Sequence, residues 1–281
     1  MRILLLLPLA LFFSCKQSSN KTVSGPPTDH ALAAEANKPN ASNDKVYVTY
    51  VADTTNLSPE PETPIKLMLE GSFHKQEVWQ GAEKKPWLAV FYENNRYYLR
   101  STALSIHPAY DPVYDSDQEI EGSRVISGRE VLSQDSSTVF FLTGLTKYTE
   151  GELDTVAFKR NIIPANRALR YTFKGKPYSI SAYGDSVQLG KNEYSYRNYG
   201  WKVGGTKKGR RIEQILAEDA QFDESIYMLL WAGDLDRDGI PDLLIDISNH
   251  YNVSSIALFL SSMADKGKLY KQVALFQTIG C

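Results

Sequence analysis

Four aspartates near the C-terminal end of the chain have the spacing of a calcium-binding loop. Carboxylates stand at loop positions one, three, five and nine, a glycine at position six allows the sharp turn, and the carbonyl of position seven is a further ligand. Carboxylates this close repel one another unless a hard divalent cation balances them. The predicted ligands are Asp234, Asp236, Asp238, the carbonyl of Ile240, and Asp242, and the glycine is Gly239. We therefore expect a structural calcium site; the alternative is a solvated acidic turn that holds no ion.

The loop differs from an EF-hand and resembles a calcium-binding loop of another kind. Its twelfth position is Ile245, where an EF-hand has a bidentate glutamate, and the residues that follow alternate as in a strand. The D-x-D-x-D-G-x-x-D pattern running into the apolar residues 243–245 resembles the FG-GAP or VCBS-type repeat of extracellular proteins. Two expected strands that follow, over residues 255–260 and 269–276, strengthen the resemblance. The resemblance implies the same five calcium ligands. Because a propeller needs at least four blades and the chain has one such loop, we expect no full propeller.

The N-terminal residues predict an export signal. Arg2 precedes an apolar run over residues 3–13, which fits the core of a secretory signal and is too short for a membrane span of about 20 residues. Ser14 followed by Cys15 resembles the lipobox of bacterial lipoproteins, in which the cysteine is lipidated. The resemblance implies a signal peptide over residues 1–14 and a lipid anchor at Cys15 in the bacterial cell envelope, with the outer membrane as the expected membrane. The alternatives are cleavage elsewhere and an uncleaved anchor.

The residues after Cys15, the position of the second cysteine and the overall charge lead to three further expectations. Residues 15–43 are rich in Ser, Asn, Pro, Ala and Lys, which predicts a disordered tether. The other cysteine is Cys281, so we expect no disulfide within the mature fold. The chain has 31 basic and 33 acidic residues and no basic run, so nucleic acid is not an expected partner.

The rest of the chain predicts a mainly β fold. Short apolar or alternating runs are separated by turn residues, and 17 tyrosines suit half-buried strands. We expect antiparallel strands and hairpins in one or two packed β modules, over residues 44–160 and 161–281, with few short helices. Strands are expected over residues 46–51 and 155–158, and the asparagines at 94–95 favour a tight hairpin turn.

Histidine and serine give weak support for catalysis. His250 lies in the polar stretch 246–252, where Ser248 or Ser254 with a nearby aspartate would supply the residue types of a nucleophilic triad. A G-x-S-x-G elbow is absent from the sequence, as are zinc, nucleotide and thiol-redox motifs. A loop histidine is the favoured interpretation of His250, although it stays a candidate ligand-binding residue. His74 is isolated in the sequence.

Aromatic residues in one segment offer a second binding candidate. Tyr194, Tyr196 and Trp201 would stack on sugar rings if they shared an exposed face, although core packing is the commoner role of such residues.

These observations lead to one expected function and one alternative. We expect a lipid-anchored, extracytoplasmic envelope protein with a structural calcium ion, which is not an enzyme and which binds an envelope glycan or protein. The alternative is an extracytoplasmic hydrolase that acts on glycan or ester near His250.

Overall fold

The structure is a computed structural model that describes residues 58–115, 126–135, 137–191 and 193–280. The described residues belong to one compact unit. The predicted signal peptide, the tether, the expected strand over residues 46–51 and both cysteines lie outside the described residues. Within the described ranges, no helix has the length and apolar character needed to cross a membrane.

The prediction of a mainly β fold is confirmed, because sixteen strands and two 3₁₀ helices make up the regular structure of the described residues. The first eight strands are β1 (Lys66–Met68), β2 (Gly71–Phe73), β3 (Trp87–Glu93), β4 (Arg96–Thr102), β5 (Ser105–Ala109), β6 (Gly128–Leu132), β7 (Thr138–Thr143) and β8 (Gly151–Leu153). They form an N-terminal sheet of order β1-β7-β3-β4-β8 and a small sheet of order β2-β6-β5. The 3₁₀ helices are η1 (Lys75–Glu77) and η2 (Ala82–Lys84).

The remaining eight strands form two larger hairpin systems. They are β9 (Ala168–Phe173), β10 (Lys176–Gly190), β11 (Glu193–Lys207), β12 (Arg210–Gln221), β13 (Met228–Gly233), β14 (Asp242–Asp246), β15 (Val253–Leu260) and β16 (Lys271–Ile279). The outer sheet has the order β12-β11-β10-β9, and the central sheet has the order β13-β14-β15-β16. All strand pairings in the four sheets are antiparallel.

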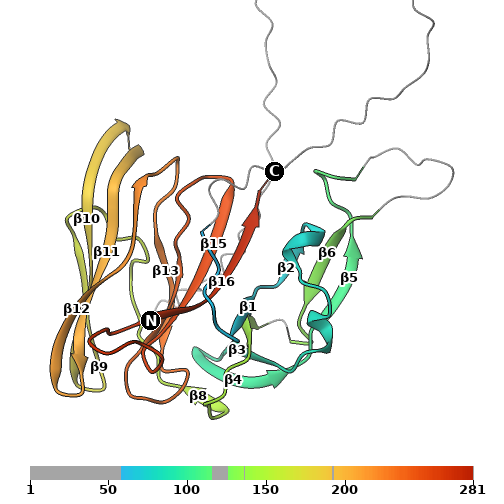
Figure 1. Ribbon diagram of the computed structural model, residues 1–281, viewed down its shortest axis with the longest axis horizontal. Coiled ribbons are helices and arrows are strands. Elements are labelled where there is room, and N and C mark those ends of the chain that lie inside the picture. The colour runs from blue at the N-terminus through green and yellow to red at the C-terminus, as the bar shows by residue number, and fades with distance from the viewer. Residues whose placement is uncertain (1–57, 116–125, 136, 192, 281) are drawn as a thin grey trace, which may run out of the picture. The chain divides into compact units, whose positions relative to one another are not determined.

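The central sheet is buried on both faces, which explains why its strands are almost continuously apolar. Leu244 packs into the cluster shared with the N-terminal sheet, whereas Leu243 and Ile245 pack into the cluster shared with the outer sheet. The rings of Trp231 and Phe140, 5.6 Å apart at their centroids, join the central and N-terminal sheets. The central strands therefore lie between the outer sheet and the strands of the N-terminal half (Figure 1).

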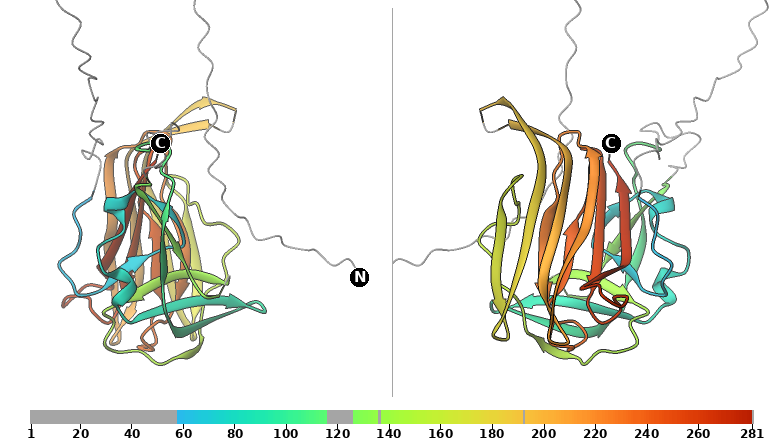
Figure 2. Two further views of the ribbon diagram at one scale, coloured as in Figure 1. Left: turned by 90° about the vertical axis from the view of Figure 1, so that its right-hand side faces the viewer. Right: turned by 60° about the vertical axis from the view of Figure 1, so that its left-hand side comes forward.

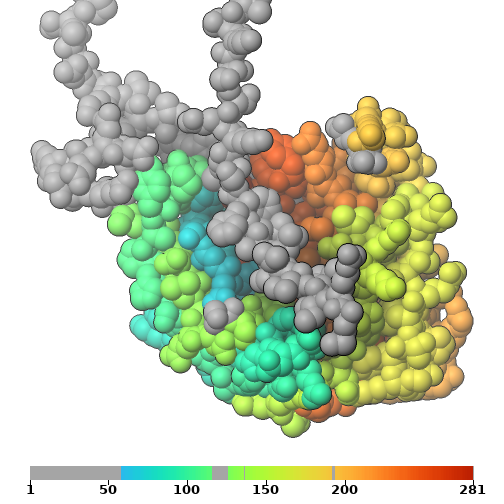
Figure 3. Space-filling model, turned by 180° about the vertical axis from the view of Figure 1, so that it is seen from behind, coloured from blue at the N-terminus to red at the C-terminus, as the bar shows by residue number. Residues whose placement is uncertain are grey.

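The outer sheet has the longest strands and covers one side of the central sheet. Figure 2 shows β10 and β11 as a long hairpin that extends beyond the other strands. From behind, the yellow residues of the outer sheet and the blue to green residues of the N-terminal half lie on opposite sides of the molecule (Figure 3). One face of the outer sheet thus packs on the core and the other faces solvent.

Two local predictions have opposite outcomes. The hairpin turn is confirmed, since Asn94 and Asn95 have φ of 50° and 64° and join β3 to β4. The expected strand over residues 155–158 is wrong: Thr155 forms only an isolated bridge to β13, and Ile162 forms another farther along. The segment between these bridges has more residues than the part of β13 that it borders, so it cannot pair in register. The module boundary near residue 160 stays a prediction.

Candidate metal centre

The acidic loop, residues 234–242, joins β13 to β14, and its flanking residues pair across its base. Its backbone has positive φ at Arg237, 59°, and at Gly239, 85°. Glycine adopts this conformation without steric cost, which explains its place at the sixth position of the loop. The Arg237 guanidinium donates to the Glu152 carbonyl at 2.9 Å and so fixes the loop against β8.

Three of the four loop aspartates converge, with one carboxylate oxygen of each within 4.8 Å of the others. They are Asp234, Asp236 and Asp242. The fourth, Asp238, is engaged by its neighbours: one oxygen accepts the N–H of Ile240 at 2.8 Å, and the other accepts the Ser261 hydroxyl. The structure therefore brings three predicted carboxylate ligands together. The ligand roles of Asp238 and of the Ile240 carbonyl stay predictions.

Asp234 has a buried carboxylate oxygen that lacks a hydrogen-bond partner. The residue is 1% exposed. Its Oδ2 accepts the Gly239 N–H at 3.1 Å and the Lys174 ammonium at 2.7 Å, but Oδ1 has no partner among the described residues. An unpaired buried polar oxygen costs about 1–3 kcal/mol. A cation bound by Oδ1 would remove that cost.

Asp242 is held rigidly at the base of the loop. It is 0% exposed, and its two oxygens each accept a backbone N–H at 2.9 Å, from Leu235 and from Ser261. Burial raises the pKa of Asp242 well above its usual value, and the nearby Asp236 carboxylate raises this pKa further. A divalent cation would act in the opposite direction, because it favours the ionised carboxylate.

The turn after β15 supplies contacts that the local sequence pattern did not reveal. The Ser262 hydroxyl donates to Asp236, and the Ser261 hydroxyl donates to Asp238. Ser261 stands 23 residues from Asp238 in the sequence, and Ser262 stands 26 residues from Asp236. The turn therefore fixes two aspartate side chains from outside the loop motif.

Two lysines bring positive charge to the acidic loop. Lys174, in the β9–β10 turn, contacts Asp234 at 2.7 Å and Asp154 at 2.9 Å, and its side chain is 41% exposed. Lys207 donates to the Ser261 carbonyl. Burial lowers the pKa of Lys207, while the charge of Asp238 opposes that shift. With Arg237 in the loop itself, three positive groups face four carboxylates, so the ionised loop keeps an excess of one negative charge.

The residues present fit a hard cation such as Ca²⁺. Converging carboxylate oxygens are the ligands that this ion prefers, and Asp234 also has a buried Oδ1 that lacks a partner among the described residues. Lys174 stands where it would compete with the ion for Asp234, and its partial exposure lets it withdraw into solvent.

The side chain of His250 contacts an aspartate and a backbone N–H, and no serine hydroxyl is among these partners. Its Nε2 is 3.1 Å from Asp223, and its Nδ1 accepts the Asn252 N–H at 3.3 Å. The Ser248 hydroxyl donates to Asp246 instead. Among the described residues, both ring nitrogens are therefore engaged without a serine hydroxyl, and no nucleophile is aligned with His250.

The three candidate aromatic residues of β11 do not all lie on one exposed face. Trp201 is 1% exposed, and its indole N–H donates to the Tyr199 hydroxyl at 2.7 Å in the core. Tyr196 packs against the same core, whereas Tyr194 is 47% exposed. Trp201 is therefore a core residue and does not contribute to an exposed platform for stacking on sugar rings.

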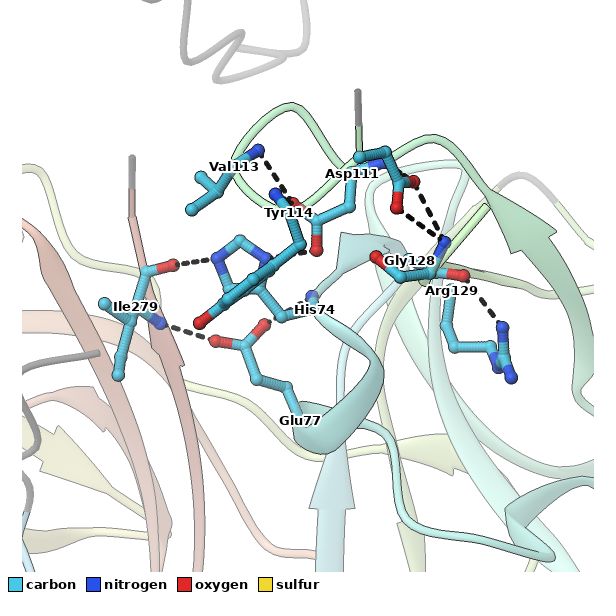
Figure 4. Close-up of polar contacts among 10 residues, drawn as sticks. His74, Glu77, Asp111, Val113, Tyr114, Gly128, Arg129 and Ile279 are labelled. Atoms are coloured by element: carbon cyan, nitrogen blue, oxygen red, sulfur yellow. Dashed lines mark hydrogen bonds and ion pairs between the residues drawn. The ribbon is translucent and has the colours of Figure 1, made fainter. Parts of the chain in front are cut away.

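A second buried polar cluster, which we call the histidine clamp, comprises His74, Glu77, Asp111 and Ile279 (Figure 4). The His74 ring lies between the Asp111 carboxylate, 2.6 Å from Nδ1, and the Ile279 carbonyl, 3.0 Å from Nε2. Both ring nitrogens of His74 face acceptor oxygens. Glu77 accepts the N–H of Ile279 at 2.6 Å and that of His74 at 2.8 Å.

The histidine clamp ties the end of β16 to the N-terminal half of the chain. The contact from His74 to Ile279 spans 205 residues, so no local pattern could have predicted it. Asp111 is 2% exposed, and its other oxygen accepts the Val113 N–H at 3.0 Å. The clamp is thus a closed structural network, because each carboxylate oxygen in it has a partner.

Comparison of the chain with protein-family models, with curated proteins and with solved structures found no match.

Proposed function

We propose that this chain is a lipid-anchored protein of the bacterial cell envelope whose folded part is stabilised by one Ca²⁺ in the acidic loop, and that it acts by binding and not by catalysis. The observation that carries the calcium part is the buried Oδ1 of Asp234, which has no partner among the described residues. A carboxylate oxygen of Asp234 also lies close to oxygens of Asp236 and Asp242, which supports the same assignment. The FG-GAP-like spacing of the loop supports it independently.

In this proposal the ion stabilises the junction of three segments. The acidic loop contacts the turn after β15 through Ser261 and Ser262, and it contacts the β9–β10 turn through Lys174. With a dissociation constant of about 0.1 mM and about 1 mM free calcium, binding adds roughly 1.4 kcal/mol to the free energy of unfolding. That gain is a structural contribution.

Thermal unfolding of the purified chain tests the calcium part. We expect 1 mM Ca²⁺ to raise the melting temperature by about 3–6 °C over excess chelator, and Mg²⁺ to raise it less. Asp236→Ala should abolish the calcium-dependent rise. Asp265→Ala, which removes an exposed aspartate from the nearby β15–β16 turn, should retain it. An equal melting temperature with and without calcium in the unmodified protein would refute the calcium part.

Replacing each cysteine tests the lipid anchor. In a bacterial host, Cys15→Ser should abolish incorporation of labelled palmitate and move the protein from the membrane fraction to the soluble fraction. Cys281→Ser is the matched control and should leave both properties unchanged. Palmitate incorporation that persists in Cys15→Ser would contradict the proposed anchor.

The hydrolase alternative is not favoured by the geometry around His250. Its ring nitrogens are engaged by Asp223 and Asn252, and Ser248 donates to Asp246. Glycan or ester turnover that is abolished by His250→Ala in a folded protein would reverse this preference.

A further inference from the structure

The solvent-facing side of the outer sheet contains a hollow of about 340 Å³ that we call the arginine trough. It is lined by residues from all four strands of the sheet. The lining residues that alternate with buried core residues, and so face outward, are Arg170, Thr172, Pro177, Ser179, Gly204, Thr206 and Arg211.

The hollow exists because the two middle strands carry small residues where the edge strands carry long ones. In the register of the sheet, Ser179 on β10 pairs with Arg170 on β9 and with Gly204 on β11. Gly204 has no side chain to fill the space, and a Cβ there would lie 2.8 Å from the Ser179 hydroxyl. The edge strand β12 places Arg211 beside Thr206 and Glu213 beside Gly204. The floor is thus low, with Arg170 on one edge and both Arg211 and Glu213 on the other.

The two arginines are available to a ligand. Among the described residues, neither guanidinium donates a hydrogen bond to another protein group. Arg211 has Glu213 as an ion-pair partner at 3.7 Å, but this separation is beyond a hydrogen bond, and the two side chains are 76% and 60% exposed. Each guanidinium presents five N–H donors in a planar fork that matches carboxylate and phosphate oxygens.

The spacing of the arginines indicates the shape of the ligand. The edge strands are three strand spacings apart, about 14 Å. Arg170 on one edge and Arg211 on the other both line the hollow. The hydroxyls of Ser179 and Thr206 add donors and acceptors along the floor. A volume of about 340 Å³ holds a small molecule or the end of a chain.

We propose that the arginine trough is a binding site for an anionic ligand that carries two oxyanion groups, one for Arg170 and one for Arg211. The shared chemistry is a pair of carboxylate or phosphate groups, as in an acidic oligosaccharide or a diphosphate. This proposal goes beyond the calcium site and the lipid anchor and rests on neither, so its failure would leave both unaffected.

Titration calorimetry of the full chain with three probes tests the proposal. The probes are digalacturonate, pyrophosphate and the uncharged disaccharide maltose. We expect at least one of the two anions to bind with a dissociation constant below about 1 mM, with affinity that falls as salt rises, and maltose not to bind. Which anion binds identifies the carboxylate or the phosphate source.

Three variants locate the binding. The double variant Arg170→Gln with Arg211→Gln should weaken binding at least tenfold, and Gly204→Ala should weaken it while it keeps both charges. Lys202→Gln removes one charge from the same face outside the lining and should change the affinity less than twofold. Unchanged melting temperatures establish that the variants are folded.

Two results with the anions, and one with maltose, would overturn the proposal. One is that neither anion binds the unmodified chain. The other is that an anion binds equally well to the double arginine variant. Binding of maltose as tight as that of the anions would also contradict the assigned role of the guanidinium groups.

Discussion

The acidic loop and the histidine clamp are both buried carboxylate clusters, but they differ in whether the protein alone satisfies their oxygens. In the clamp, the Asp111 carboxylate contacts the His74 imidazole and backbone N–H groups, and Glu77 accepts two backbone N–H groups. In the loop, Asp234 keeps one buried oxygen that has no partner among the described residues. The clamp is complete as folded, whereas the loop gains a partner when a cation binds.

The difference teaches that burial of acids does not by itself indicate a ligand. Both clusters contain a carboxyl whose pKa is raised by burial, Glu77 in the clamp and Asp242 in the loop. What distinguishes them is the buried oxygen of Asp234 that has no partner among the described residues. Variants that change this pairing therefore test the comparison.

The largest effect is expected from Asp242→Ala in the acidic loop. Its carboxylate accepts the N–H groups of Leu235 and Ser261, which would both be left buried and unpaired. We expect a loss of about 3–5 kcal/mol in the free energy of unfolding, even in chelator. Urea denaturation measures this loss. A loss below 1 kcal/mol would mean that Asp242 does not organise the base of the loop.

His74→Ala should have a somewhat smaller effect, about 2–4 kcal/mol, because it leaves the Asp111 carboxylate and the Ile279 carbonyl without the imidazole. Unlike variants of the acidic loop, it should leave calcium-dependent stabilisation unchanged. Denaturation with and without calcium checks both points. His107→Ala, at an exposed histidine, is the matched control and should cost little. Loss of the calcium-dependent stabilisation in His74→Ala would contradict the view that the histidine clamp is independent of the calcium site.

The loop and the clamp also show how much the sequence can predict. The calcium-loop spacing lies within nine residues, so the turn at Gly239 and the convergence of Asp234 with Asp236 were accessible locally. The mainly β fold and the Asn94–Asn95 turn could also be predicted, because their patterns likewise lie within short stretches of the sequence.

Contacts between distant segments were not accessible from one sequence. Lys174 reaches Asp234 across 60 residues, and His74 reaches Ile279 across 205 residues. The arginine trough is likewise a product of strand register, since Ser179 meets Gly204 only once β10 and β11 pair. Trp201 looked like a candidate platform residue because strand alternation alone does not say which face is buried.

A sharper test of the loop is Lys174→Gln. If the ammonium competes with calcium for Asp234, its removal should tighten calcium binding about fivefold, or roughly 1 kcal/mol, since the lysine is partly exposed. Titration calorimetry measures the change. Lys176→Gln, at an exposed lysine of the same hairpin, is the control. Unchanged or weaker binding in Lys174→Gln would show that the lysine is not a competitor.

The smallest effect concerns the pH dependence of the clamp. Burial raises the pKa of Glu77 above its unfolded value of 4.5. Relative to the unfolded chain, the fold therefore favours the protonated Glu77 side chain. The contribution of this group to the free energy of unfolding is fully present below pH 4.5 and is lost as the pH rises through the pKa of Glu77 in the folded protein. Because glutamine does not titrate, the destabilisation by Glu77→Gln should shrink as pH rises from 4 toward 7. A destabilisation that grows with pH would contradict this sign.

Direct calcium binding is the measurement that tests the central claim. Equilibrium dialysis of the purified chain should give one Ca²⁺ per chain with a dissociation constant on the order of 0.1–1 mM. Asp236→Ala should abolish this binding, and the clamp variant His74→Ala should retain it. Absence of bound calcium in the unmodified chain, or binding that survives Asp236→Ala, would contradict the assignment of the acidic loop as the metal centre.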